Sequence, residues 1–101
     1  MRVLFVCNQN KHRSKTAEEL FSASFETASA GLYAGELVTQ ESISWADLVV
    51  VMEDEQRLEI SKRFPTEYLR KRILSLGISD VYHYNQPELK EILQFKMSQA
   101  L

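Results

Sequence analysis

Short apolar runs alternate with amphipathic stretches along this chain, which is the pattern of buried strands separated by helices. The first run, Val3–Val6, is β-branched at both ends and suits a strand buried on both faces. The run over residues 47–52 is continuous and suits a second buried parallel strand. Between them, residues 13–26 carry apolar side chains at helical spacing. The pattern predicts strands at 2–7, 27–30, 47–52 and 72–76, and helices at 13–26, at 55–64 and from residue 87 onward.

Turn and cap residues set the expected ends of these elements. Asp54 is expected to cap the helix over 55–64, which Phe64-Pro65 would end. Pro87 suits the first position of the last helix, with Asn85 or Gln86 as its cap. The buried face of that helix is expected to consist of Leu89, Ile92, Leu93 and Met97.

Residues 32–45 have weak periodicity and two glycine-adjacent turns. We expect a loop there, with at most a turn of helix from Gln40 to Trp45. The helix over 55–64 has a thin apolar stripe, so it should cover its part of the sheet poorly.

The order of strands and helices predicts the fold class. Alternation of this kind requires right-handed crossovers, and it gives an α/β domain with a parallel sheet and helices on both faces. Ligands in such sheets bind at the carboxyl ends of the strands. Cys7 ends the first strand, and Asp80 lies in the loop after the last one. We therefore expect both residues at the same edge of the sheet.

The stretch Cys7–Ser14 joins the first strand to the first helix, and the rest of the chain is organised around it. A loop in this position presents backbone N–H groups, and the helix dipole adds partial positive charge. Such a loop is an anion-binding site before any side chain is considered.

Two side chains indicate what the loop could do with an anion. Five residues separate Cys7 from Arg13, so the loop can wrap a tetrahedral anion while the guanidinium binds two of its oxygens. The dipole, the N–H groups and Arg13 all favour the thiolate form of Cys7. A thiolate beneath a bound phosphate is a nucleophile aimed at phosphorus. The simpler alternative is a small buried Cys that closes a strand, with an unrelated Arg on the surface.

Composition limits the remaining possibilities. The 101 residues suit one domain, residues 1–101, and 45% hydrophobic with 26% charged residues is ordinary for a globular protein. A net charge of −2 argues against a nucleic-acid binder that relies on a broad basic field. One Cys allows no internal disulfide and suits a reducing cytoplasm, and with two scattered His it makes no zinc site. We expect no signal peptide and no membrane-spanning helix.

Four stretches carry a family signature, and they occur in family order over most of the chain. They are Val3–Cys7 followed by Asn10, Arg13-Ser14 and Ala17-Glu18; Ser29-Ala30-Gly31; Ala46–Met52; and Ile78–Tyr82. Together they resemble the low-molecular-weight protein tyrosine phosphatases. The resemblance implies a four-stranded sheet of order 2-1-3-4 and a phosphomonoesterase that needs no metal or cofactor. Its substrate would be a phosphotyrosine-containing protein or a small aryl phosphate, with inorganic phosphate as product, and neither nucleic acid nor membrane as partner.

The resemblance also implies a role for each site residue. Cys7 would attack phosphorus, Arg13 would hold phosphate oxygens, and Asp80 would be the general acid and then the base. Tyr82 would stand at the rim and stack on an aromatic leaving group; Tyr33 and Trp45 are weaker rim candidates. Phosphate would be bound along the loop by Asn8, Gln9, Asn10, Lys11, His12, Arg13 and Ser14.

Several of these residues also have plainer interpretations. Ser14 would donate its hydroxyl to the Cys7 thiolate, or it would merely start a helix. Asp80 could be a turn-forming residue, and Tyr82 one more half-buried aromatic. Asn10 tolerates a left-handed backbone, which a tight loop needs. His12 is most simply a loop residue.

This sequence departs from the family pattern at the site. Gln9 stands where the family usually has Gly, and Val81 replaces the Pro that stiffens the acid loop. Lys11-His12 replaces an apolar residue followed by a second Cys. The family is typically about half as long again, and most of the missing length falls between Gly31 and Asp47.

Three other functions are compatible with parts of this pattern. Arsenate reduction on the same scaffold consumes additional cysteines, so this chain would need an external thiol. A sugar-transport phosphocarrier uses a similar Cys loop but lacks the Arg, so Arg13 argues against it. A non-catalytic phosphate or phosphopeptide-binding module would not need Cys7 and Asp80 together.

Overall fold

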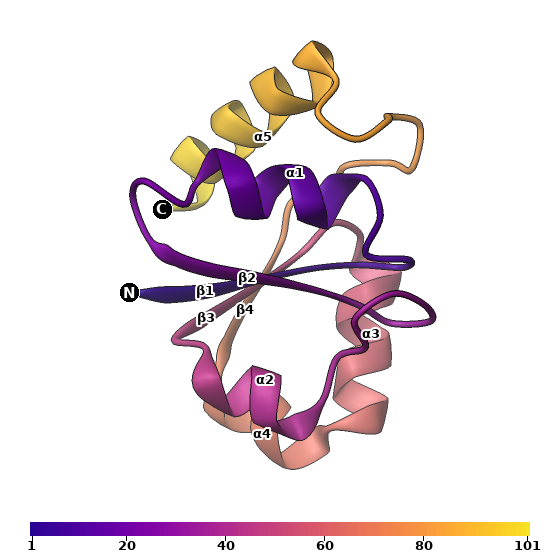
Figure 1. Ribbon diagram of the computed structural model, residues 1–101. Helices are drawn as coiled ribbons and strands as arrows, with labels where there is room; N and C mark the ends of the chain where they lie inside the picture. Colours follow the sequence, from indigo (N-terminus) through magenta and orange to yellow (C-terminus); the bar gives the residue numbers. More distant parts are fainter.

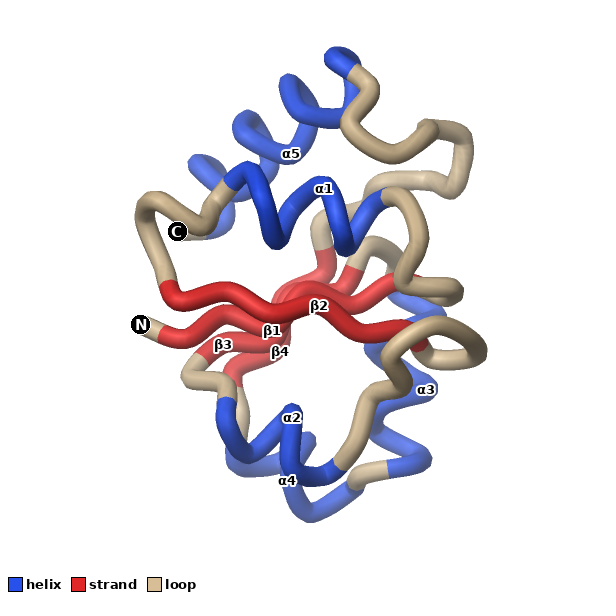
Figure 2. The backbone as a smooth tube through the Cα atoms, viewed as in Figure 1, coloured by secondary structure: helices blue, strands red, loops and turns tan.

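A computed structural model describes all residues, 1–101, and shows a parallel sheet between two layers of helices (Figure 1). Four strands pair in the order β2-β1-β3-β4, so the predicted α/β fold and strand order are confirmed. Figure 2 shows α1 and α5 on one face of the sheet and α2, α3 and α4 on the other. The strands are β1 (Arg2–Cys7), β2 (Glu26–Gly31), β3 (Leu48–Val51) and β4 (Arg72–Ser75); the helices are α1 (Arg13–Leu20), α2 (Gln40–Trp45), α3 (Asp54–Arg63), α4 (Pro65–Arg70) and α5 (Pro87–Ala100).

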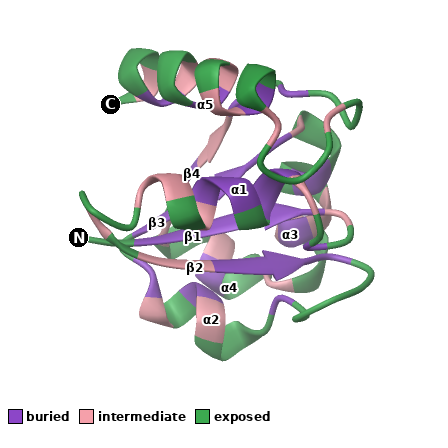
Figure 3. Ribbon diagram, turned by 45° about the horizontal axis from the view of Figure 1, so that its top comes forward, coloured by how far each residue is buried: buried purple, intermediate pink, exposed green.

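The central strand β1 contributes to a hydrophobic cluster on each face of the sheet. Val3, Phe5 and Cys7 belong to the cluster beneath α1 and α5. Leu4 and Val6 belong to the cluster on the opposite face. This is the two-sided burial expected of a strand in a covered parallel sheet. In Figure 3 the central strands β1 and β3 are buried almost throughout, β4 and the start of β2 are only partly buried, and the outer surfaces of the helices are exposed.

The first helix is shorter than predicted. The helix expected over 13–26 ends at Leu20, and β2 already begins at Glu26. Apolar spacing misled the prediction, because Phe21 and Phe25 still pack on the core from a turn closed by the hydrogen bond between Phe25 N and Phe21 O (3.0 Å). The hydroxyl of Ser22 donates to Glu19 O (2.8 Å), a local bond that competes with helix continuation.

Two further boundaries differ from the prediction on the α3 side. Asp54 is the first residue of α3 and not its cap; Glu53 holds the cap position, and its N–H donates to Gln56 Oε1 (3.0 Å). Pro65 does end α3 as predicted, but it also begins α4, which the sequence analysis missed. The end of α3 and the start of α4 have the same cause, because Pro cannot extend a helix yet is favoured in the first turn of the next one.

The remaining elements agree with the prediction. The turn of helix from Gln40 to Trp45 is α2, and its cap is Thr39, whose hydroxyl accepts from Ser42 N (3.1 Å). Pro87 begins α5, which buries Leu89, Leu93 and Met97 as expected, with Ile92 partly buried. Gln86 holds the cap position without a side-chain cap bond. No helix is both long and apolar enough to cross a bilayer.

Packing of α5 against the sheet generates a stability prediction. Leu93 is fully buried in the cluster under α1 and α5, so Leu93→Ala should lower the free energy of unfolding by about 2–5 kcal/mol. Leu69 on α4 is 84% exposed, and Leu69→Ala should change it by about 0.5 kcal/mol or less. Urea unfolding of the two variants measures both values. Equal losses would contradict the placement of α5 on the core.

Candidate functional site

Cys7 lies at the carboxyl end of β1, where it is 3% exposed and contacts the start of α1. Its Sγ is 3.0 Å from Ser14 Oγ. Asn10 Nδ2 donates to the same Ser14 oxygen (2.9 Å). Because that oxygen already accepts from Asn10, the Ser14 hydroxyl proton is available to donate to sulfur. The structure therefore brings these three predicted site residues together in one hydrogen-bonded chain.

The backbone N–H groups of the loop are the second feature of the site. None of those from Asn8 to Ser14 donates a hydrogen bond within the protein. Arg13 and Ser14 are among the most deeply buried residues of the chain, at 1% and 0% exposed. Buried N–H groups nearly always have a partner in native proteins, so a run of unpaired donors indicates a place for an external acceptor.

The segment that follows β2 braces this loop from the side. Leu32 N donates to Cys7 O (3.0 Å), and Tyr33 N donates to Asn8 O (2.9 Å). Glu36 N donates to Asn10 Oδ1 (3.2 Å). The carbonyls of Cys7 and Asn8 and the Asn10 side chain are thus paired, while the loop N–H groups are not.

The close approach of the two segments sets requirements at two positions. Asn10 has a left-handed backbone (φ 52°), as the sequence analysis expected of the loop Asn. Gly35 is also left-handed (φ 73°), and a Cβ there would lie 2.7 Å from Gln9 O and 2.8 Å from Asn10 Cβ. A side chain at Gly35 would therefore push against the loop as well as strain its own backbone.

Arg13 is buried beneath the loop and pairs with two other segments. Its Nη1 donates to Glu53 Oε1 (2.6 Å) and to Ile78 O (2.7 Å). Its Nε lies 3.7 Å from Asp80 Oδ1. These contacts use Nη1 and Nε, and they leave Nη2 without a protein partner. The guanidinium is held in place by the protein and still has one end available.

Glu53 is a site residue to which the sequence analysis gave no role. It lies two residues after the end of β3, at the same edge of the sheet as Cys7, and this position in the sequence could have identified it as a candidate. Gln56 reinforces it: Oε1 accepts from Met52 N (2.8 Å) and Glu53 N (3.0 Å), and Nε2 donates to Asn8 Oδ1 (3.1 Å). Gln56 thereby ties the Cys7 loop to the turn before α3.

Asp80 has an exposed side chain (56%) on the loop between β4 and α5, and it reaches Arg13 as described. That loop begins at the sheet, where Ile78 N donates to Met52 O (2.7 Å). Glu53 also lines a hollow beside the site, together with Asp54, Glu55, Gly77 and Ser79. Nowhere in the structure do three or more His, Cys, Asp or Glu side chains gather as a group that could hold a metal ion.

The remaining predicted site residues take different positions. Tyr82 is partly buried against the core under α5, whereas Tyr33 is 61% exposed next to Asn8, with the Arg63 guanidinium 5.0 Å from its ring centre. Trp45 packs on the opposite face of the sheet. Gln9 and Lys11 are exposed on the loop, and His12 is partly buried at its end.

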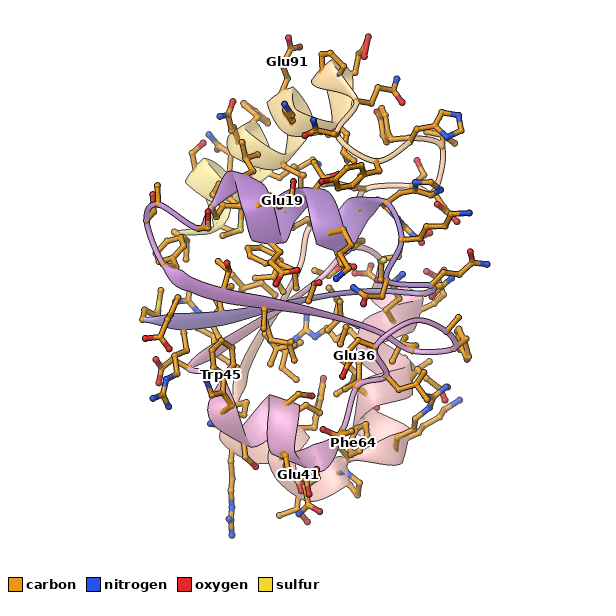
Figure 4. All side chains as sticks on the ribbon, in the orientation of Figure 1. Glu19, Glu36, Glu41, Trp45, Phe64 and Glu91 are labelled. Carbon is orange, nitrogen blue, oxygen red and sulfur yellow. The ribbon has the colours of Figure 1, made fainter.

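One ionisable group near the site has a shifted pKa. Tyr84, on the loop that carries Asp80, donates its hydroxyl to Glu19 Oε2 (2.5 Å). This hydrogen bond raises the pKa of Tyr84 above its ordinary value of 10.0, and the nearby Glu19 charge acts in the same direction. Glu19 is labelled on α1 in Figure 4.

Known structures share this architecture. The chain is similar to the arginine phosphatase YwlE from Geobacillus stearothermophilus (21% identity, TM-score 0.74, 98% of this chain and 91% of that one). It is also similar to a low-molecular-weight protein tyrosine phosphatase from T. tengcongensis, with 24% identity and a TM-score of 0.75 over 100% of this chain and 99% of that one. A third similar structure is that of the tyrosine phosphatase Wzb from Escherichia coli K30 in complex with phosphate, with 21% identity and a TM-score of 0.73 over 98% of this chain and 94% of that one. No family model and no curated protein matches the sequence. The chain has the low-molecular-weight phosphatase fold.

The Tyr84–Glu19 bond generates a pH prediction. Because the folded-state pKa of Tyr84 is raised, the bond's contribution to stability is complete below pH 10 and is lost as the pH rises through the folded-state value. Subtracting the tyrosinate absorbance titration of Tyr84→Phe from that of the unmodified protein isolates Tyr84. The difference should have its midpoint above 10, and Glu19→Gln should move it down. A midpoint that is unchanged in Glu19→Gln would contradict the assignment of the raised pKa of Tyr84 to Glu19.

Proposed function

We propose that this protein is a phosphatase that hydrolyses phosphate monoesters through a phosphocysteine intermediate. The observation that carries the proposal is the run of unpaired N–H groups from Asn8 to Ser14 around the Cys7 thiol. The free Nη2 of Arg13 and the Asp80 carboxyl beside it supply the other required groups.

Binding of the phosphoryl group would use the loop donors and Arg13. Phosphoryl transfer needs stabilisation of charge on three oxygens, and preorganised N–H groups supply it without rearrangement. Arg13 already pairs with Glu53, so its charge is partly compensated before substrate arrives. Asp80, beside Arg13, would supply the proton for the leaving oxygen as the general acid.

The reaction would then proceed in two steps. Cys7 Sγ attacks phosphorus, the bond to the leaving oxygen breaks, and Asp80 gives that oxygen its proton. Water next attacks the phosphocysteine, Asp80 takes a proton from the water, and inorganic phosphate and the Cys7 thiolate are released. The Ser14 hydroxyl, held by Asn10, stabilises the thiolate both as nucleophile and as leaving group.

Two classes of substrate fit this site. The first is phosphotyrosine or a small aryl phosphate, for which the exposed Tyr33 ring beside Asn8 offers a stacking surface. The second is phosphoarginine, because an arginine phosphatase is as similar to this chain as the tyrosine phosphatases are. The carboxylates that line the hollow at Glu53 could face a guanidinium. Relative kcat/KM on phosphotyrosine and phosphoarginine peptides separates the two classes.

Other functions on this scaffold make different demands. Arsenate reduction would need an external thiol, because Cys7 is the only Cys in the sequence. A binding module would hold phosphate without turnover. A reducing compartment such as the cytoplasm would keep Cys7 in the thiol state that the proposal requires.

The first functional prediction concerns Cys7→Ser. The variant should lose turnover of p-nitrophenyl phosphate but bind inorganic phosphate with an affinity within a few-fold of the unmodified protein, because the N–H groups and Arg13 bind the anion independently of sulfur. Steady-state kinetics with EDTA present and calorimetry with phosphate measure the two properties. Steady-state hydrolysis by the pure variant would rule out a covalent mechanism at Cys7.

The second concerns the general acid. Asp80→Asn should slow phenyl phosphate by about 10²-fold or more and p-nitrophenyl phosphate much less, because proton donation matters most for a basic leaving oxygen. Glu41→Gln is the control, since Glu41 is exposed on α2 and makes no contact with Arg13 or with the hollow at Glu53. An unchanged ratio of the two rates in Asp80→Asn would assign the acid to another residue.

A further inference from the structure

The loop that carries Asp80 is fastened to the start of α1 by two hydrogen bonds away from the sulfur. Tyr84 N donates to His12 Nδ1 (2.9 Å), and Asn85 N donates to Thr16 Oγ1 (2.8 Å). In Figure 1 the orange segment before α5 lies beside the first turn of α1. Both acceptors are side chains, and the residues they hold are 72 and 69 positions away in the sequence.

We propose that His12 and Thr16 are positioning residues for the general acid: they clamp the Asp80 loop against the end of the Cys7 loop. The inference rests on the proposed function, in which Asp80 must reach the leaving oxygen. Neither side chain touches the sulfur or Asp80 in the structure, so their effect would pass through the backbone of Tyr84 and Asn85.

Burial and hydrogen bonds fix the position of the Thr16 side chain, which accepts from the Asp80 loop. It is 1% exposed, and its hydroxyl donates to His12 O (2.7 Å). Because the hydroxyl proton is used there, the oxygen faces Asn85 N as an acceptor. His12 O also accepts from Thr16 N (3.0 Å), so one turn of helix joins the two acceptors of the clamp.

The clamped end of the loop has a fixed local shape. Asn85 is left-handed (φ 62°), and Gln86 Oε1 accepts from His83 N (2.9 Å), which closes the turn before α5. The rings of His12 and His83 meet edge to face, with centres 5.5 Å apart. The Tyr84 hydroxyl adds a third attachment, to Glu19 on α1.

The other end of the same loop is attached to the sheet. Ile78 N donates to Met52 O, and Ile78 O accepts from Arg13 Nη1 (both 2.7 Å). Asp80 therefore lies on a short span with one end held at Ile78 and the other at Tyr84. Val81 in that span is 70% exposed, so packing holds it little. Tyr82 in the same span packs against the core under α5, so Asp80 is restricted by that packing together with the two attached ends.

The test compares Thr16→Val, which removes the acceptor at nearly constant volume, with Thr16→Ser, which keeps it. Thr16→Val should slow phenyl phosphate hydrolysis by about tenfold, the equivalent of one lost hydrogen bond, and p-nitrophenyl phosphate by less. Thr16→Ser should stay within about twofold of the unmodified protein on both substrates. His12→Asn, which keeps an acceptor near the position of Nδ1, and His12→Leu form the second matched pair.

Two measurements distinguish positioning from general destabilisation. In the Asp80→Asn background, Thr16→Val should have no further effect on phenyl phosphate, because the acid it positions is absent. Amide hydrogen exchange at Tyr84 and Asn85 should accelerate in Thr16→Val and remain slow in Thr16→Ser.

Each result then has one meaning. Slower phenyl phosphate hydrolysis that depends on Asp80, with faster exchange, supports the clamp. Unchanged exchange, or rate losses that add fully to that of Asp80→Asn, would overturn it. Absence of any hydrolysis by the unmodified protein would instead overturn the proposed function, and the exchange measurement alone would then decide whether the clamp exists.

Discussion

Unpaired backbone N–H groups at the end of β1 are the constraint on which this structure depends. A loop that keeps its donors free needs other contacts to hold its shape, and neighbouring segments provide them here. The segment after β2 donates hydrogen bonds to the carbonyls of Cys7 and Asn8, and Gln56 donates one to the Asn8 side chain. The Asn10 side chain bonds to both Glu36 and Ser14. These contacts brace the loop from three neighbouring segments and use none of its backbone N–H groups from Asn8 to Ser14.

The buried guanidinium of Arg13 adds a second constraint at the same place. A charge that is 1% exposed is strongly unfavourable unless it is paired, and Glu53 together with the Ile78 carbonyl provides that pairing. Both partners come from loops at the carboxyl edge of the sheet, so folding of β3 and β4 is what delivers them. The parallel topology thus brings the partners of Arg13 to the edge of the sheet where Cys7 lies.

The part of the site that is local in sequence could be predicted, and the part formed by distant segments could not. Cys7, Asn10, Arg13 and Ser14 sit within one strand–loop–helix unit, whose spacing is readable from apolar periodicity and residue type. Glu53 pairs with Arg13 across 40 positions; its place just after β3 indicates the right edge of the sheet, but the choice of Arg13 as its partner is set by tertiary packing. The same limit explains α4 and the end of α1, where Pro65 and Phe25 are compatible with more than one local structure. It also explains Tyr82, whose packing against the core under α5 is settled by tertiary contacts.

Two departures from the family pattern are physically connected in this fold. Val81 stands where a Pro would restrict the acid loop through its own ring, so here the loop must be restricted from outside. His12 stands where the family often has a second Cys, and an imidazole nitrogen is a far better acceptor for the Tyr84 N–H than a thiol is. His12 can therefore supply from outside the restraint that Val81 does not supply. In this chain the start of α1 serves both parts of the proposed reaction, because the loop that leads into it has unpaired backbone N–H groups while His12 and Thr16 hold the loop that carries Asp80.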